Sequence, residues 1–159
     1  MAVVKLLEFR EIDEEFFTRW DITGHQLNRH LMSESLTGTP DVLADFVTLP
    51  PGFIHHMHRH PNADQFMVPL TGSLQFNDAD GLAMALCPGR LLVVPRGNWH
   101  ELSNLGTEHS QVLHFFTGVG SIEDVGIEPY PSDGALGRGT RSQSSKPRGR
   151  SHCGSRSSV

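Results

Sequence analysis

The sequence predicts an all-β domain built as an antiparallel jelly-roll β-barrel. Short runs rich in branched and aromatic residues recur at even spacing, with turn signals between them. No helical period separates these runs, as it would in a parallel α/β sheet, so a rolled antiparallel sheet is the expected arrangement. The expected strands cover 41–49, 53–58, 65–70, 73–77, 82–87, 91–95 and 111–116.

The elements begin with one helical pattern near the N-terminus. Around residues 11–20, Asp13 is placed to cap a short helix that carries apolar Phe and Trp side chains on one side. The run DVLADFVTL then alternates with period two, which is typical of a strand, and PPG turns the chain. Further on, NDADG at 77–81 predicts a hairpin connection, and PGR at 88–90 predicts another turn.

The C-terminal segment 134–159 differs in composition from the rest of the chain. It holds six of the 13 basic residues and no acidic residue, and it consists mainly of Gly, Ser, Arg and Pro. Because such a segment has little apolar area to bury, we expect one domain over 1–133 followed by a disordered basic tail. Seven basic against 18 acidic residues give 1–133 a net charge of −11. That charge repels nucleic-acid backbones, so we expect no nucleic-acid partner; a contact of the tail with RNA or an acidic partner is the minor alternative.

The sequence shows no signal for export or membrane insertion. No apolar run approaches the ~18 residues of a membrane span. The N-terminus turns acidic by residue 8, so it lacks the apolar core of a signal peptide. Cys87 and Cys153 are too few for the disulfide framework of small secreted domains. We therefore expect a cytoplasmic protein that does not contact a membrane.

Four histidines crowd into six positions of the segment GFIHHMHRHP. If residues 53–60 are extended, successive side chains point to opposite faces of the strand. The triplet His56, His58 and His60 then shares one face, and His55 points the other way. Three imidazoles on one face repel one another when protonated, whereas a divalent cation binds neutral imidazole well. The segment therefore predicts a metal site, with a histidine-rich surface loop as the alternative.

Two further residues extend this pattern. Gln65 opens the next expected strand, where its amide oxygen can face the same interior point, and His100 follows a later proline–glycine turn. Together these features resemble the two motifs of the cupin superfamily. The first, G-x5-H-x-H-x4-E-x6-G at 52–72, is met by Gly52, His58, His60 and Gly72, with Gln65 in place of glutamate. The second, G-x5-P-x-G-x2-H-x3-N at 89–104, is met by Gly89, Pro95, Gly97, His100 and Asn104.

The resemblance implies a single cupin domain with one metal ion inside its barrel. Carried over to this chain, the ligands are His58, His60, Gln65 and His100. One divalent ion per chain is expected, with Zn first and Fe, Mn or Ni as alternatives. Because an amide at position 65 neutralises less of the cation's charge than a carboxylate, it favours polarisation of a carbonyl over redox chemistry. A degenerate cupin domain that binds no metal is the competing interpretation.

Two more histidines are candidates for proton transfer. His56 shares the predicted inward face with the ligands, and His114 lies on an expected strand among apolar residues. For each of them, a buried histidine with a structural role is the competing interpretation. His55 and His109 are expected to face solvent.

Three longer stretches resemble a narrower group of proteins. HRHPNADQFMVPLTGSLQF, LLVVPRGNWHELSN and VLHFFTGVGSIEDVGIEPYP are similar to small cupins of bacterial gene clusters for aromatic polyketides, of the tetracenomycin and spore-pigment type. This resemblance implies a role in antibiotic or pigment biosynthesis, as a cyclase or aromatase that guides ring closure of a poly-β-ketone. The implied partners are a polyketide-like substrate, components of a polyketide synthase and a second copy of the chain in a homodimer.

Two other classes of function stay open. A metal-dependent dioxygenase of the quercetinase type would use the same ligand set with a redox metal. A non-catalytic subunit would bind a polyketide or stabilise a synthase complex. Fold alone does not choose among these classes, because one fold hosts many functions.

Overall fold

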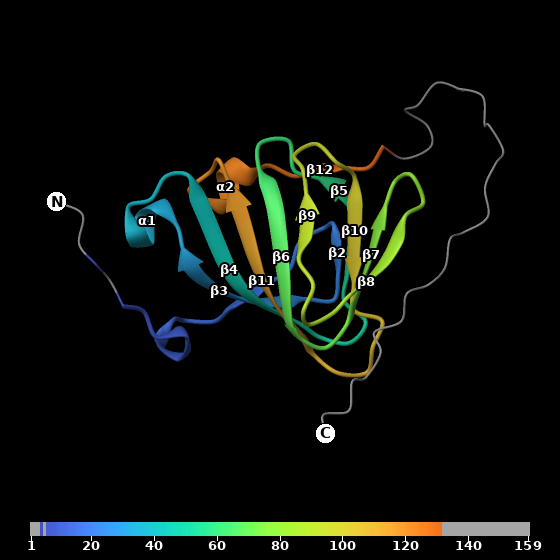
Figure 1. Cartoon of the computed structure of the whole chain (residues 1–159), viewed down its shortest axis with the longest axis horizontal. Helices are drawn as coiled ribbons and strands as arrows, with labels where there is room; N and C mark the ends of the chain where they lie inside the picture. The colour runs from blue at the N-terminus through green and yellow to red at the C-terminus, as the bar shows by residue number, and fades with distance from the viewer. Residues whose placement is uncertain (1–3, 5, 132–159) are drawn as a thin grey trace.

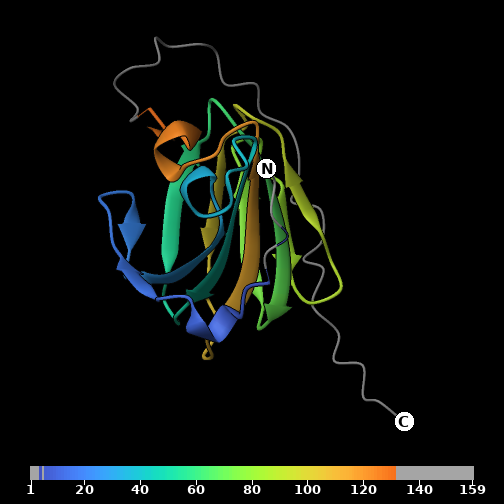
Figure 2. The same ribbon diagram turned by 90° about the vertical axis from the view of Figure 1, so that its left-hand side faces the viewer.

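Two antiparallel β-sheets face each other, and the only helices are short ones at the periphery of the described residues (Figure 1). The computed structural model describes residue 4 and residues 6–131. The predicted tail 134–159 lies outside the described residues. Turned by 90°, the sheets are seen as the two layers of a rolled barrel (Figure 2). The prediction of an all-β jelly roll is confirmed.

The first sheet contains six strands in the order β1-β3-β4-β11-β6-β9, and all neighbouring strands in it are antiparallel. Its strands are β1 (Glu15–Phe17), β3 (Gln26–Met32), β4 (Val42–Leu49), β11 (Ser110–Thr117), β6 (Asp64–Thr71) and β9 (Leu92–Val94). Among the described residues, the outer edges of β1 and β9 have no strand partner.

The second sheet follows the path β12-β5-β10-β7-β8, and β2 pairs with β5 off this path. Its strands are β2 (Ile22–Thr23), β5 (Ile54–Arg59), β7 (Leu74–Asp78), β8 (Ala83–Leu86), β10 (His100–Ser103) and β12 (Glu128–Pro129). The helical segments are η1 (Phe9–Glu11), α1 (Glu34–Thr37) and α2 (Ile122–Val125). Within the described part of the chain, no helix is long and apolar enough to cross a membrane.

The seven strands expected from the sequence are all present. In each of these seven strands, the first and the last residue lie within one position of the expected bounds. The sequence prediction omits β3 and β10, because a polar residue, Asn28 in β3 and His100 in β10, takes one of the buried positions and leaves each strand one buried apolar residue. Without apolar residues at alternate positions, the period that marks a strand is lost.

The helix predicted around residues 11–20 is wrong. The only helical turn there ends at Glu11, and residues 15–17 instead form β1, which pairs with β3. Phe16 and Trp20 are about two-thirds exposed, so the expected apolar face packs against no core. The reason is tertiary: the edge of β3 offers unpaired backbone groups, and pairing with them outweighs a weak local helical preference.

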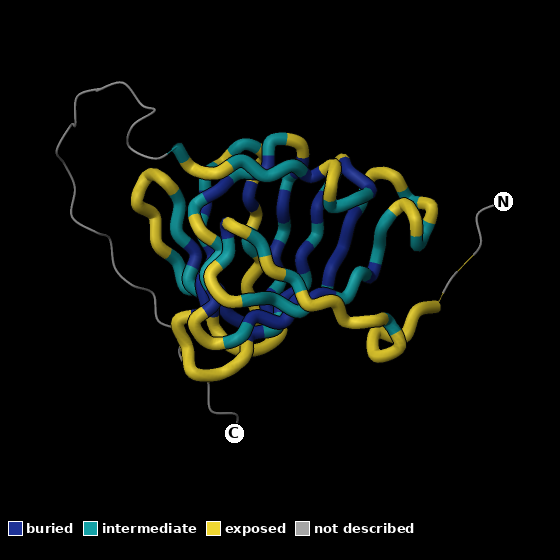
Figure 3. The backbone as a smooth tube through the Cα atoms, turned by 180° about the vertical axis from the view of Figure 1, so that it is seen from behind, coloured by how far each residue is buried: buried dark blue, intermediate teal, exposed yellow. Residues whose placement is uncertain are grey.

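The core lies between the two sheets, where alternate strand residues are buried (Figure 3). Its main apolar cluster contains Val47, Leu49, Phe53, Met67, Leu74, Phe76, Leu86, Val94, Leu102 and Val112. A second, smaller cluster contains Leu43, Ala63, Phe116, Val119 and Val125. Gln65 of β6 pairs with Val94 on one side and Phe116 on the other, so a polar residue lies between the two clusters.

The two motif segments are hydrogen-bonded to each other at both ends. At one end, the Gly97 N–H donates to the carbonyl of His60 at 2.8 Å. At the other end, the Gly52 N–H donates to the carbonyl of Asn104 at 2.9 Å. The buried Asn104 amide also donates to the carbonyl of Leu49 at 2.8 Å. The motif glycines and asparagine therefore fix the position of β5 relative to β10, the two strands that carry the histidines.

Candidate metal centre

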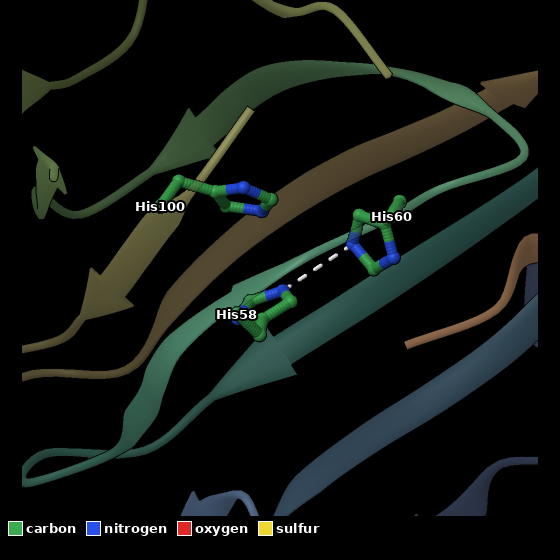
Figure 4. A group of neighbouring side chains, drawn as sticks. All are labelled: His58, His60 and His100. Carbon is green, nitrogen blue, oxygen red and sulfur yellow. Dashed lines mark hydrogen bonds between the residues drawn. The ribbon is translucent and has the colours of Figure 1, made fainter. Parts of the chain in front are cut away.

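Three histidines from two neighbouring strands converge inside the barrel (Figure 4). His58 belongs to β5, His60 directly follows it, and His100 opens β10 directly opposite His58. Their exposed fractions are 1%, 4% and 1%. One nitrogen from each ring lies within 4.8 Å of the other two, which is close enough for a single metal ion. The convergence of these three predicted ligands is thus a feature of the fold.

The orientation of each ring is set by a backbone carbonyl. Nδ1 of His58 donates to the carbonyl of His56 at 2.6 Å, and Nδ1 of His60 donates to that of Gly126 at 3.0 Å. Nδ1 of His100 donates to the carbonyl of Asn98 at 3.0 Å. Because a carbonyl only accepts, each Nδ1 carries the proton, and each neutral ring presents the lone pair of Nε2. Hydrogen bonds of this kind are how proteins orient histidine ligands of metals.

The Nε2 atoms face one another without a proton to share. Those of His58 and His60 lie 3.3 Å apart (dashed line in Figure 4), and Nε2 of His100 is buried without a hydrogen-bond partner. Two lone pairs at this distance repel each other, and a buried acceptor without a partner costs free energy. A cation bound between the three atoms would remove both penalties, so the residues fit a metal ion.

Burial also keeps the three rings neutral. Desolvation lowers the pKa of His60 to about 3 and that of His100 to about 4. It lowers the pKa of His58 far below the ordinary value of 6.5, and the neighbouring histidines act in the same direction. At neutral pH none of the rings carries a proton on Nε2. The cluster therefore presents three ligand nitrogens without first releasing protons.

Gln65 faces the interior from the opposite sheet. It is 4% exposed, and its Oε1 is buried without a hydrogen-bond partner. Its cross-strand partner on β11 is Phe116, and the ring of Phe116 meets the ring of His60 edge-on with centroids 5.2 Å apart. An unsatisfied amide oxygen beside the histidine cluster has the chemistry of a metal ligand or of a substrate acceptor.

The predicted orientations of His55 and His56 are wrong. His56 is exposed, and its Nε2 lies 2.7 Å from the hydroxyl of Thr23. His55 is largely buried, and its ring stacks on that of His58 with centroids 3.6 Å apart. The cause is a bulge: His58 pairs with His100 but His55 pairs with Leu102, so β5 contains one residue more than β10 between these pairs. An extra residue reverses the alternation of faces.

A buried carboxylate holds His55 in place, and no sequence pattern marks it. Nε2 of His55 lies 2.7 Å from Oδ2 of Asp21, a residue that is 3% exposed and precedes β2. Arg19 binds the same carboxylate through two nitrogens. Burial by itself raises the pKa of Asp21, but hydrogen bonds from His55 and Arg19 outweigh that effect and hold the pKa well below its ordinary value. Asp21 is thus a buried anion beside the histidine cluster.

His114 lies on the inner face of β11, which is the position that the proton-transfer interpretation of the sequence requires. Its Nε2 is buried without a hydrogen-bond partner, and burial lowers its pKa to about 3. The ring of Phe116 contacts both His114 and His60, with centroids 6.4 and 5.2 Å away. His114 is therefore a neutral ring with an unpartnered nitrogen near the three clustered histidines. His109 is exposed, as expected.

A second histidine–carboxylate pair lies farther along the same sheet. Nδ1 of His30 is 2.7 Å from Oδ1 of Asp45, which pairs across the strands with His114. The hydrogen bond with Asp45 raises the pKa of His30 to about 9, against an opposing effect of burial. Sequence reasoning missed this pair because β3 itself was not predicted.

Comparisons with known proteins agree with this fold. Residues 45–116 match the cupin domain family. No curated protein matches the chain. The chain is similar to a solved structure described as a predicted oxalate decarboxylase from Thermotoga maritima, at 22% identity and a TM-score of 0.65, covering 72% of this chain and 100% of that chain.

Two more solved structures share the fold. One, from Silicibacter pomeroyi, is described as a sugar phosphate isomerase from a cupin superfamily. It has 20% identity and a TM-score of 0.60, covering 71% of this chain and 75% of that one. The other is KdgF from Halomonas sp., at 22% identity and a TM-score of 0.59, covering 72% and 94%. Likeness at these identities shows the jelly-roll fold alone and leaves the reaction open.

Proposed function

With a cupin domain at residues 45–116 as the premise, we propose that this protein binds one divalent metal ion per chain and uses it to activate a carbonyl substrate. The proposed ligands are His58, His60, Gln65 and His100. The observation that carries this proposal is the 3.3 Å approach of the unprotonated Nε2 atoms of His58 and His60. Without a cation, that contact is repulsive, and the buried Nε2 of His100 and Oε1 of Gln65 stay unsatisfied.

Among divalent metals, the ligand set favours Zn²⁺. Imidazole nitrogens and one oxygen suit Zn²⁺, and Fe, Mn and Ni bind the same donors. When bound, such a cation draws electron density from a carbonyl oxygen and makes the adjacent C–H more acidic. Among the described residues, the cluster of candidate ligands contains three histidines and no carboxylate. A neutral set preserves the positive charge of the cation, which supports polarisation rather than redox chemistry.

The substrate class that we propose is a poly-β-ketone of aromatic polyketide biosynthesis, on the strength of the sequence resemblance. Ring closure in such a chain joins a methylene carbon to a second carbonyl carbon. The surroundings of the cluster suit it, because apolar rings contact two of its members: Phe116 packs against His60 and Phe76 stacks against His100. A dry, closed site holds the ketone chain in one register and so selects one ring pattern.

His114 is the proposed base of this reaction. Its unpartnered Nε2 accepts the methylene proton, and the C–H electron pair forms the new C–C bond to the second carbonyl carbon. The oxygen of that carbonyl becomes an alkoxide, and His114 returns the proton to it. The ring of His114 is neutral at pH 7 and ready to accept a proton, because burial lowers its pKa. His56 takes no part in this proposal, since it is exposed.

The test is a reconstituted polyketide synthase with and without this protein, purified without a histidine tag. We expect one metal per chain by elemental analysis and a shift of products toward one ring pattern. His100→Ala should lose both the metal and the shift. His114→Gln should keep the metal and lose the shift, while the exposed His109→Gln serves as the matched control.

The same experiment separates the alternatives. Oxygen consumption that depends on metal, with loss of the effect under anaerobic conditions, would replace this proposal by a dioxygenase. A ring pattern that is unchanged in both His100→Ala and His114→Gln would replace it by a non-catalytic subunit that stabilises the synthase.

A further inference from the structure

A cavity lies beside the candidate metal centre, and none of the four proposed ligands lines it. Its volume is about 320 Å³, and it opens between the β7–β8 hairpin on one side and β9 with the turn at 95–99 on the other. β8 and β9 are the terminal strands of the two sheets, so within residues 6–131 no strand pairing closes the barrel between them. The cavity is therefore an opening of the barrel wall that the fold itself leaves.

The rim of this cavity is preformed. The carboxylate of Asp78 accepts hydrogen bonds from the backbone N–H groups of Asp80 and Leu82 at 3.0 and 2.8 Å, which fixes the hairpin tip. On the opposite side, the guanidinium of Arg59 lies 4.6 Å above the ring of Trp99 and holds one face of it. Tyr130 packs edge-on against the same indole at 5.1 Å. The two sides of the opening therefore need little rearrangement to receive a ligand.

The cavity shares walls with two of the proposed metal ligands. Phe76 lines it and stacks on the ring of His100, with centroids 5.9 Å apart and an angle of 16°. Val94 lines it and pairs across the strands with Gln65. Trp99 precedes His100 in the chain. A ligand held in this cavity thus lies one side chain away from the cluster.

The lining determines which ligands fit. Phe76, Met84, Leu92, Val94 and Trp99 make most of the walls apolar, and two of these five side chains are aromatic rings. Asp78, Asp80 and Asn98 are the polar residues, and no Lys, Arg or His of the described part of the chain lines the cavity. Carboxylate and phosphate ligands would be repelled by the two aspartates. A neutral ring system would pack on the walls, and its hydroxyl groups would donate to the polar residues.

We propose that this cavity binds a neutral, hydroxylated aromatic ring system of one or two rings, with its inner edge against Phe76 and Val94. The inference deepens the proposed function and rests on it for the ligand class, because ring closure of a poly-β-ketone produces such phenols. A cavity of about 320 Å³ lies at the lower end of the range for small-molecule sites, which limits the bound part to about two fused rings.

The experiment titrates metal-free full-length Trp20→Phe protein with 2-naphthol at pH 7. Trp99 is then the only tryptophan in the chain, and it lines the cavity. We expect saturable quenching of its fluorescence by 2-naphthol and at least tenfold weaker binding of the anionic 2-naphthoate. Asp80→Lys should strengthen 2-naphthoate binding. Equal affinities for the two probes in the Trp20→Phe protein would overturn the inference.

Two exposed leucines supply a matched pair of variants. Leu82 lines the cavity, whereas Leu105 is exposed outside it. Leu82→Glu should weaken 2-naphthol binding at least fivefold, and Leu105→Glu should leave it unchanged. Equal effects of the two substitutions would contradict the proposed location. A dimer that dissociates with Leu82→Glu, together with no naphthol binding, would assign this opening to a second copy of the chain instead.

The binding test does not depend on the metal. Naphthol binding by a protein that takes up no metal would leave the cavity assignment standing and overturn the proposed function. Metal uptake with no naphthol binding would overturn the cavity assignment and leave the proposed function standing.

Discussion

The imidazole rings of His55 and His58 stack face to face, with centroids 3.6 Å apart and an angle of 16° between their planes. His55 is itself held by Asp21, and Asp21 is held by Arg19. The ring of His58 therefore has two restraints, the hydrogen bond of its Nδ1 to the carbonyl of His56 and the stacked ring of His55. A buried anion before β2 thus acts on a candidate metal ligand in β5 through an intervening ring.

Asp21→Asn should weaken metal binding. The neutral amide keeps the size of the side chain but binds His55 and Arg19 less strongly. Loss of an outer-shell partner of a metal ligand costs roughly 10- to 100-fold in metal affinity, and we expect the lower end because Asp21 acts through His55. Competition with a chromophoric chelator measures the affinity. Thr23→Val, which removes the contact of Thr23 with the exposed His56, is the control and should change nothing.

His100→Ala should abolish stoichiometric metal binding, because it removes a ligand nitrogen and leaves a hole beside His58. His56→Ala should keep one metal per chain, because His56 lies outside the cluster. Elemental analysis and thermal unfolding report both results. Metal at about 100 times its dissociation constant stabilises a protein by about 2.7 kcal/mol, so the melting temperature of His56→Ala should rise with added Zn²⁺. Retention of metal by His100→Ala would show that the ion binds elsewhere.

Much of the fold was predictable because its signals are local. Alternating apolar residues and turn signals located seven strands, and the motif spacing identified His58, His60 and His100 as neighbours. These inferences needed only the period of a strand and the known spacing of a motif. Gln65 also lies on the inner face, as expected of the first residue of its run.

The remaining features depend on contacts that no local pattern records. The bulge in β5 exchanges the orientations of His55 and His56, and nothing in the segment HHMH marks the residue at which the alternation changes. Asp21 reaches His55 across 34 positions of sequence, and His30 reaches Asp45 across 15. Only the pairing of strands brings such partners together.

The pair His30–Asp45 should make stability depend on pH in the alkaline range. The folded-state pKa of His30 is raised to about 9, mainly by its hydrogen bond with Asp45. Protonated His30 therefore stabilises the fold fully below pH 6.5, and this contribution is lost as the pH rises through about 9. His30→Gln should cost on the order of 2 kcal/mol at pH 6 and much less at pH 9.5. Urea unfolding of metal-free protein at several pH values measures the difference.

The exposed His109→Gln provides the comparison for that series. Its effect on the free energy of unfolding should be small at every pH. A cost of His30→Gln that is the same at pH 6 and pH 9.5 would show that the pair contributes no charge-dependent stability.

Gly72→Ala should destabilise the protein strongly. Gly72 joins β6 to β7 at a φ of +75°, and a methyl group added there would lie 2.9 Å from Cα of Ser110. Left-handed backbone and overpacking each cost a non-glycine residue about 1–2 kcal/mol, so the sum is about 3 kcal/mol. Gly81→Ala is the matched control, because Gly81 has a φ of +88° and open space around it. It should cost about 1 kcal/mol by urea unfolding. Equal costs would mean that Ser110 moves aside.

Gln65→Glu tests the chemistry at the position where this chain departs from the motif. A carboxylate adds negative charge beside three neutral histidines, so metal affinity should stay equal or rise. The same charge reduces the pull of the cation on a carbonyl oxygen, so ring closure by polarisation should slow, by roughly tenfold for each 1.36 kcal/mol lost at the transition state. Single-turnover rates in the reconstituted polyketide system measure this step, and chelator competition measures the affinity.

Two comparisons make this result decisive. Gln65→Met fills a similar volume without a hard oxygen ligand, so it should weaken metal binding as well as slow the reaction. If the site instead cycles a redox metal with oxygen, Gln65→Glu should be neutral or faster, because a carboxylate stabilises the higher oxidation state. Faster turnover that requires oxygen would therefore overturn polarisation and favour the dioxygenase. Slower turnover with undiminished metal content, equal in air and under nitrogen, is the outcome that a neutral ligand at position 65 predicts.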